Sequence, residues 1–432
     1  MLAVRTRRSP AREEGLTVSV FVGDLDIPRY RMALDNPLHE QYYAEVASTR
    51  ANGWLQRWLC GYVVFGHEDV TALLRERRLH QAAGKVPALL AGIENPVSSL
   101  PADDILLAEG DKHLRLRRLV AEAFSPKSVD GLRPAIRGHV GRLIDEASSN
   151  AKRDVDGRIR LEFQSMIDEL PVAVIGDMLG TGREDFPMYS KWAESHFQVL
   201  KSSAVGDTER DTRLARDAEE FDRYCVALIE ARRRNLTDDL LSRLITAEEA
   251  GDRLTTGELV SLIRSFIAAG IDTTRNQLGT MIALILDTPQ AWDTLRSDRT
   301  LVPGAVEEAL RLLNPIRMAM RLVHETFEYR GVVFPTGTLI GIGLSGASRD
   351  DEHFADPDEF RPERGNARDH MAFSFGVHHC LGAALARAEL QETLAVLLTK
   401  WRGVALSAPV EWKHAKLPVW GPAALHLSVD PA

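Results

Sequence analysis

The chain has few cysteines, and their placement excludes two classes of protein. Only Cys60, Cys225 and Cys380 occur among its 432 residues. An odd number of widely spaced cysteines fits neither a disulfide framework nor a CxxC metal site. We therefore expect a protein of a reducing compartment.

Long apolar runs and an excess of positive charge are also missing. No stretch approaches the roughly 18 apolar residues that a membrane-spanning helix needs. The start, "MLAVRTRRSPAREEG", lacks the apolar core of a signal peptide. The net charge of −9 argues against binding nucleic acid through bulk charge. We expect a cytoplasmic protein with a disordered tail at residues 1–15 and one domain at residues 16–432.

The patterns that are present are mostly helical. Segments such as "HEDVTALLRER", "LEFQSMIDELPVAVIGDML" and "ERDTRLARDAEEFDRYCVALIEARRR" carry apolar residues at helical spacing. Residues 255–288 predict one helix of about 30 residues, apolar enough to cross the middle of a domain. Alternation and turn glycines predict strands at residues 320–345 and 404–429. The residues alone thus predict a mainly α-helical domain with small β-sheets.

The stretch "AFSFGVHHCLGAALARAEL" places Cys380 directly before a strongly helical segment. Zinc is a poor match, because consecutive histidine and cysteine residues cannot readily face one tetrahedral ion. A small buried apolar filler is the ordinary role of a free cysteine. A third possibility is a thiolate, since the amide groups of a helix N-terminus stabilise a negative sulfur. Such a soft, electron-rich thiolate suits haem iron.

The same stretch resembles the haem-binding loop of the cytochrome P450 family, whose pattern is F-x-x-G-x-x-x-C-x-G. Phe373, Gly376, Cys380 and Gly382 match this pattern, and Ser374 stands where many bacterial members have glycine. The resemblance implies that Cys380 is the axial ligand of the iron of haem b.

Polar residues interrupt the long central helix at "AAGIDTTRN". An acid and a β-branched alcohol are unfavourable inside an apolar helix, while Ala269 and Gly270 remove side-chain bulk and leave room for a ligand. The stretch resembles the family's oxygen-binding motif, A/G-G-x-D/E-T. The resemblance implies that Thr273 hydrogen-bonds the dioxygen and that Asp272 controls proton delivery. Heterolytic cleavage of the O–O bond consumes two protons.

The haem propionates need cationic partners. In "DKHLRLRRL", His113 and Arg117 stand at i,i+4 on one helix face, where a solvated basic stripe is the ordinary interpretation. The resemblance implies instead that both bind propionates, together with Arg321 and His378. Three further cations of this helix form either a solvated face or a patch for an acidic electron donor. They are Lys112, Arg115 and Arg118.

Glu308 and Arg311 of "EEALR" stand at i,i+3, a spacing most often used by surface ion pairs. Their apolar surroundings and the later "FRPER" resemble the family's E-x-x-R structural network. By this resemblance the pair supports folding and haem retention, with Arg361 or Arg364 as a third partner.

By alignment with the family, the substrate pocket draws on residues 80–104 and on "SHFQVLKSS" (residues 195–203). It also includes Ser265, Ala268, Ile316 and Met318. Ser265 either hydrogen-bonds an oxygenated substrate or bonds back to its own helix. Methionine suggests an adaptable apolar wall, although alternate methionines also fit opposite faces of a strand.

The resemblance covers nearly the whole chain and implies the P450 fold, a single triangular-prism-like domain with haem between the central helix and the cysteine loop. It implies a haem-thiolate monooxygenase that hydroxylates or epoxidises a hydrophobic small molecule. Electrons would come from a ferredoxin and its NAD(P)H-dependent reductase. The alternatives are a peroxide-driven peroxygenase and a non-catalytic haem-thiolate sensor or recruitment domain. We expect a monomer without nucleic-acid or membrane partners.

Overall fold

The computed structural model of the chain describes most of its residues. The described ranges are 5–6, 19–30, 39–58, 60–86, 89, 104–151, 153–154, 156–198, 208–249, 254–413 and 419–432. Most of the expected pocket loop (residues 87–88 and 90–103) and residues 199–203 lie outside them. Within the expected tail only Arg5–Thr6 is described, as strand β1 paired with β3, so disorder at residues 1–15 stays a prediction.

Helices make up most of the described chain. They are α1 (His39–Ala51), α2 (His67–Arg75), α4 (Gly110–Ala121), α5 (Pro126–Asn150), α6 (Phe163–Ile167), α7 (Glu169–Leu179), α8 (Phe186–Gln198), α9 (Thr208–Arg234), α10 (Leu240–Glu249), α11 (Thr256–Asp287), α12 (Ala291–Ser297), α13 (Val302–Leu312), α14 (Leu344–Ala347) and α15 (Ala383–Lys400). No helix among the described residues is long and apolar enough to cross a bilayer.

The strands are short and form small sheets. They are β1 (Arg5–Thr6), β2 (Val20–Phe21), β3 (Leu25–Asp26), β4 (Gln56–Trp58), β5 (Gly61–Val64), β6 (Leu79–Gln81), β7 (Ile159–Glu162), β8 (Ala319–Val323), β9 (Phe327–Tyr329), β10 (Val332–Phe334), β11 (Leu339–Ile342), β12 (Trp401–Leu406), β13 (Glu411–Trp412), β14 (Pro422–Ala424) and β15 (His426–Pro431). The largest sheet has the order β4-β5-β11-β8-β6, with β11 parallel to β5. The mainly α-helical fold with small sheets is confirmed.

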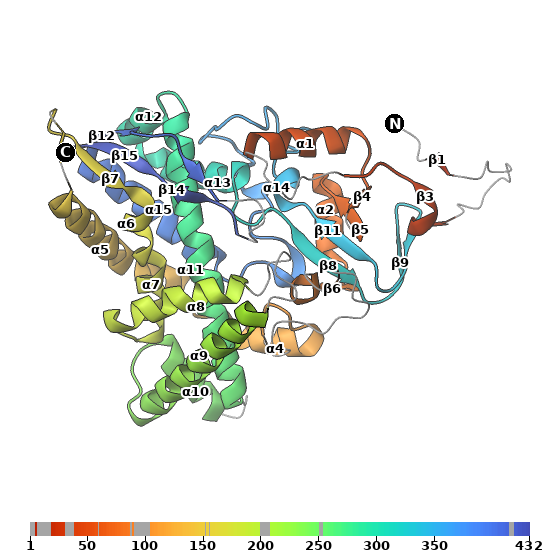
Figure 1. Cartoon of the computed structure of the whole chain (residues 1–432), viewed down its shortest axis with the longest axis horizontal. Coiled ribbons are helices and arrows are strands. Elements are labelled where there is room, and N and C mark those ends of the chain that lie inside the picture. The colour runs from red at the N-terminus through yellow and green to blue at the C-terminus, as the bar shows by residue number, and fades with distance from the viewer. Residues whose placement is uncertain are drawn as a thin grey trace.

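The expected central helix is α11, which spans 32 residues. Its N-terminus is closed by a capping box, in which the Thr255 hydroxyl accepts from the Glu258 N–H and the Glu258 carboxylate accepts from the Thr255 N–H. Most of its side chains are buried in the main hydrophobic core, against α6, α7, α8, α13 and α15. Figure 1 shows α11 running through the middle of the helical part of the molecule.

One expected helix begins later than predicted. The sequence pattern predicts a helix from Leu161, but Leu161 and Glu162 are the last residues of strand β7, which pairs with β15. The Glu162 carboxylate then caps α6 by accepting from the N–H groups of Gln164 and Ser165. The strand was missed because its partner is more than 260 residues away, and a local pattern carries no information about that partner.

A fully buried ion pair joins α13 to the chain before the cysteine loop. Arg311 Nε and Nη2 donate to the two carboxylate oxygens of Glu308, at 2.6 and 3.0 Å, and both side chains are fully buried. The remaining Arg311 donors reach the carbonyl oxygens of Ser348, Pro357 and Glu359. Such complete satisfaction of both charges is what makes a buried pair tolerable.

Both arginines named as third partners contact this pair in different ways. The Arg361 backbone N–H donates to Glu308 Oε2 at 2.9 Å, while its side chain pairs with Asp356 at the surface. Arg364 Nε lies 3.1 Å from Glu308 Oε1, as an ion pair without hydrogen-bond geometry. The side-chain partner is therefore Arg364.

Removing the carboxylate charge of Glu308 should strongly destabilise the fold. In Glu308→Gln, Arg311 stays buried without a counter-charge, and we expect the free energy of unfolding to fall by about 3–5 kcal/mol. Urea denaturation followed by circular dichroism measures this change. Glu363→Gln, whose side chain is 63% exposed, is the matched control and should change stability by less than about 0.5 kcal/mol. Equal stability of the two variants would contradict the structural role.

Candidate active site

The cysteine loop is held by backbone contacts and two left-handed residues. The Cys380 N–H donates to the Phe373 carbonyl at 2.9 Å. Ser374 has φ of 59° and Gly376 has φ of 73°. A Cβ on Gly376 would lie 2.4 Å from the Leu74 carbonyl oxygen, so glycine is required where the loop meets the end of α2. Ser374 adopts a conformation that glycine would adopt without strain, which explains why glycine is frequent there in the resembled pattern.

The environment of the Cys380 thiol combines burial with access. Its side chain keeps solvent-exposed surface, although surrounding protein atoms raise its pKa by burial. A hydrogen bond from the Gly382 backbone and the charges of Arg117 and Arg387 act in the opposite direction and favour the thiolate.

Three residues that the motif analysis missed brace this loop from α13 and α15. Arg387 Nε and Nη2 donate to the two carboxylate oxygens of Glu307 at 2.8 and 3.0 Å, and its guanidinium lies 4.5 Å from the Phe373 ring centroid. His370 lies 3.1 Å from Glu307 Oε2. Burial opposes ionisation of Glu307, but these partners outweigh it and lower its pKa to about 2. The signal in the sequence was the doubled glutamate of "EEALR", of which only Glu308 belongs to the motif.

Two of the four predicted propionate ligands, His113 and His378, lie close together beside one carboxylate. The rings of His113 and His378 are 4.3 Å apart at their centroids, and His378 Nε2 lies 3.1 Å from Glu109 Oε2. Burial, together with the charges of His378 and Arg117, lowers the pKa of His113 to about 4. Glu109, at the N-cap of α4, also accepts from the Gln81 N–H. Glu109 was not singled out from the sequence, because only its partners reveal it.

Arg117 and Arg321 differ in how their charges are satisfied. The half-buried Arg117 guanidinium forms no hydrogen bond or ion pair with another described residue, and burial lowers its pKa. Arg321 is 4% exposed, donates to Gln81 Oε1 at 2.6 Å, and has its pKa lowered by burial to about 10. Arg117 therefore carries the less satisfied charge.

The predicted oxygen-activation residues lie in the middle of α11. The half-buried Thr273 hydroxyl donates to the Ala269 carbonyl at 2.6 Å. The buried Asp272 carboxylate instead faces Arg275 of the same helix, whose Nε donates to Oδ1 at 2.8 Å and whose Nη2 lies 2.7 Å from the same oxygen as an ion pair. A Cβ at Gly270 would lie 2.9 Å from Ile175 of α7. The missing side chain of Gly270 therefore allows α7 to approach, in addition to any room it leaves for a ligand.

The predicted pocket residues have unequal surroundings. Ser265 is buried, and its single hydroxyl proton has two acceptors at 2.9 Å, the carbonyl of Ser261 in its own helix and Asp104 Oδ1. Ala268 is 1% exposed. The remaining two predicted residues, Ile316 and Met318, are partly exposed and pack beside the hydrophobic clusters under the largest sheet.

The residues of this site fit a haem group. Cys380 offers a soft sulfur with solvent-exposed surface, and the unpaired guanidinium of Arg117 offers donors that an anionic propionate would satisfy. Arg321, His113 and His378 supply further donors beside it. The chemistry of the donor set thus matches an anionic macrocycle held by a thiolate.

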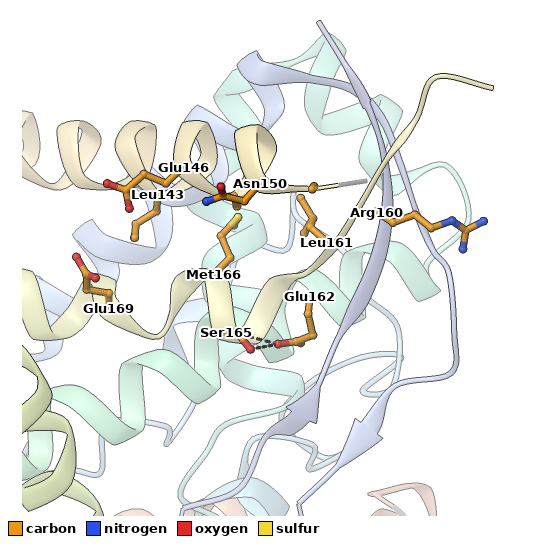
Figure 2. A pocket seen from close by; sticks show the side chains of 11 residues that line it. Leu143, Glu146, Asn150, Arg160, Leu161, Glu162, Ser165, Met166 and Glu169 are labelled. Carbon is orange, nitrogen blue, oxygen red and sulfur yellow. Dashed lines mark hydrogen bonds between the residues drawn. The ribbon is translucent and has the colours of Figure 1, made fainter. Parts of the chain in front are cut away.

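A separate surface pocket, of about 430 Å³, lies between α5, β7 and α6 (Figure 2). Its carboxylates are already engaged, since Glu146 and Glu169 pair with Arg183 and Glu162 accepts hydrogen bonds from Ser165. Its lining comprises Leu143, Glu146, Ala147, Asn150, Ala151, Arg160, Leu161, Glu162, Ser165, Met166 and Glu169. None of these belongs to α11 or to the cysteine loop, so this pocket is not part of the candidate site.

Known proteins resemble the chain over most of its length. The family model described as cytochrome P450 matches residues 63–407. Nocardicin C N-oxygenase of Nocardia uniformis subsp. tsuyamanensis is 34% identical over 365 residues, which cover 82% of this chain and 86% of that protein. Mycinamicin IV hydroxylase/epoxidase of Micromonospora griseorubida is 30% identical over 363 residues, with the same coverage of 82% and 86%. The solved structure of P450BioI in complex with hexadec-9Z-enoic acid ligated acyl carrier protein has a TM-score of 0.81 at 26% identity, covering 90% of this chain and 99% of that chain.

The bracing carboxylate Glu307 should make stability depend on acid pH. Its folded pKa of about 2 lies below the ordinary value of 4.5, so its contribution of about 3 kcal/mol is complete above pH 4.5 and is lost as pH falls toward 2. Urea unfolding of Glu307→Gln between pH 5.5 and 3 should show a flatter pH dependence than the wild type. The exposed Glu411→Gln is the control and should keep the wild-type slope. An unchanged slope in Glu307→Gln would refute the assignment.

Proposed function

The chain belongs to the cytochrome P450 family of monooxygenases, and from that premise we propose that it hydroxylates or epoxidises a hydrophobic small molecule with electrons from a ferredoxin and an NAD(P)H-dependent reductase. The observation that carries this proposal is the Cys380 thiol, which keeps solvent-exposed surface and is close enough to Arg117 and Arg387 for their charges to favour its thiolate. Ferredoxins and their reductases supply electrons in a reducing compartment, so we propose that the protein lies in the cytoplasm.

Cys380 would hold the iron of haem b, and Arg117, Arg321, His113 and His378 would hold its propionates. When bound, the haem supplies the iron chemistry that activates dioxygen. On this side the protein opposes the effect of burial, which on balance raises the pKa of the Cys380 thiol. The Gly382 backbone hydrogen bond and the two flanking arginines favour the thiolate against the effect of burial.

Thr273 and Asp272 would serve proton delivery on the opposite side. The Thr273 hydroxyl is only partly buried and is held by a single carbonyl, so its oxygen is still able to accept a hydrogen bond. Arg275 fixes the Asp272 carboxylate close to its helix. We propose that Thr273 orients the proton at the reacting oxygen and that the ion-paired Asp272 controls the passage of protons toward it, while the apolar core excludes bulk water.

The surface beside the cysteine loop supports docking of an acidic electron donor. Val377, three residues before Cys380, is 41% exposed, and Leu114 of α4 is 55% exposed. Lys112 and Arg118 of α4 are exposed near Leu114. An apolar contact point with cations around it matches a small acidic partner such as a ferredoxin.

The substrate class follows from chemistry and from relatives. Ala268, Ile316 and Met318 offer an apolar lining. The names of two relatives, nocardicin C N-oxygenase and mycinamicin IV hydroxylase/epoxidase, state small-molecule substrates. A solved relative binds an acyl chain on a carrier protein. We therefore propose a hydrophobic small molecule, either free or attached to a carrier protein.

Replacing the thiol should abolish the thiolate signature. In the reduced, CO-treated protein the wild type should absorb near 450 nm, because the thiolate pushes electron density onto iron. Cys380→Ala should lose this band, whereas Cys225→Ala, which removes a buried cysteine of α9, should keep it. Retention of the band in Cys380→Ala would refute the ligand assignment.

Loss of the Thr273 hydroxyl should divert electrons from product to peroxide. With a substrate selected by its Soret shift, Thr273→Ala should release several times more hydrogen peroxide per NADH than the wild type, because a poorly placed proton no longer directs O–O cleavage. Thr280→Ala is the matched control, since Thr280 makes the same type of bond to a helix carbonyl. If Thr273→Ala couples electrons to product as well as Thr280→Ala does, the proposed role is wrong.

A further inference from the structure

Arg317, between α13 and β8, has two aromatic rings within cation–π distance of its guanidinium. The guanidinium carbon lies 4.3 Å from the ring centroid of Tyr42 in α1 and 4.2 Å from that of Trp420. Trp420 itself stacks on Trp412, with centroids 4.5 Å apart and planes within 5°. These aromatic contacts hold the guanidinium in place, and its N–H groups remain the donors for any hydrogen-bonded partner.

One in-plane edge of this guanidinium is buried and has no partner. Arg317 Nε and Nη2 are both buried without a hydrogen bond. These nitrogens form the fork that binds a carboxylate through two parallel hydrogen bonds. Arg311 and Arg387 use the same two nitrogens on Glu308 and Glu307. Arg317 therefore presents, unpaired, the geometry that this chain twice uses for a carboxylate.

The chain does not itself satisfy this fork. Within the described ranges, no carboxylate oxygen lies within 4.0 Å of an Arg317 nitrogen. Glu45 of α1 is nevertheless nearby, since the charges of both Glu45 and Arg317 affect the pKa of Tyr30. Burial raises the pKa of Glu45, whose Oε2 is itself buried without a hydrogen bond. The Tyr30 hydroxyl is buried and unpaired too. Buried donors without acceptors are unfavourable, and an incoming anion would satisfy them.

The site adjoins the segment that carries the expected pocket residues. Arg317 stands between Ile316 and Met318, and it precedes Arg321 of β8 by four residues. Four residues of extended chain span at most about 14 Å. The distance from a charged group bound at Arg317 to Arg321, a proposed haem-facing residue, is thus one that a medium-length hydrocarbon chain can span.

We propose that Arg317 binds the carboxylate of the substrate, so that this enzyme acts on a hydrophobic carboxylic acid. The reaction in this inference rests on the proposed function. The substrate class rests on the unpaired Nε and Nη2 of Arg317, which lie beside two aromatic rings. The fork grips both carboxylate oxygens, the Tyr42 and Trp420 rings hold it in place, and the hydrocarbon part of the acid extends along the apolar pocket residues.

The test compares straight-chain acids of 8 to 16 carbons with their methyl esters on the haem-loaded protein. Isothermal titration calorimetry measures the dissociation constants, and the Soret band reports displacement at iron. The wild type should bind the best acid at least about 30-fold more tightly than its ester, the loss expected when one side of a buried charged pair is removed. Arg317→Gln should abolish this preference while ester affinity stays unchanged.

Two further variants keep the result interpretable. Arg317→Lys retains the charge without the fork and should recover only part of the preference for acids. Arg402→Gln, at an arginine of β12 whose side chain is 60% exposed, should keep the full preference. Circular dichroism of each variant verifies that it is folded.

The outcomes separate this proposal from the proposed function. Equal binding of acid and ester, or a preference that survives in Arg317→Gln, overturns the role of Arg317. If acetate or sulfate alone binds with the same dependence on Arg317 and long acids bind no better, the fork is a free-anion site and the substrate class is wrong. A missing thiolate CO band defeats the proposed function, whereas the calorimetric preference for acids still decides the carboxylate site.

Discussion

The buried pair of Glu308 and Arg311 is the constraint on which the arrangement of the site depends. Two charges removed from water must have every donor and acceptor satisfied, or the fold loses several kcal/mol. Arg311 takes the carbonyl groups of Ser348, Pro357 and Glu359, so the chain between α14 and the cysteine loop has to pass beside α13. That path brings the following residues to the place where Cys380 is presented.

The neighbouring glutamate extends the same constraint to the other side of α13. Glu307 binds His370 just before the cysteine loop and Arg387 just after it. One helical turn therefore fixes the path into the loop through Glu308 and the two ends of the loop through Glu307. Arg387 also lies over Phe373 and favours the thiolate of Cys380. Arg387 thus contributes both to the packing of the cysteine loop and to the electrostatics at the sulfur.

Sequence alone predicted the parts of this structure that local patterns determine. The long apolar repeat gave α11, and the loop around Cys380 was recognisable because its glycines and its following helix are contiguous in the chain. Strand β7 was missed because its partner β15 is remote in sequence. Glu109, Glu307 and Arg317 were missed for the same reason, since single polar residues reveal their roles only through partners brought together by folding. Residues 90–103, expected to line the pocket, remain a prediction.

Arginines in this chain fall into groups according to how their forks are used. Arg311 and Arg387 close theirs on glutamates, which ties elements of the fold together. Arg117 and Arg317 have no such partner among the described residues, and each stands where an anion from outside the chain is expected. Pairing therefore distinguishes arginines that hold the protein together from those that await a ligand.

The contact between Asp272 and Arg275 has a mechanical consequence. Both residues belong to α11, three positions apart, so the acid and its counter-ion move as one rigid body. Displacements of α8 and α9, which pack across α11, would leave this contact unbroken. The carboxylate next to Thr273 therefore keeps its counter-ion whatever position α8 and α9 take, because the contact is contained within one helix.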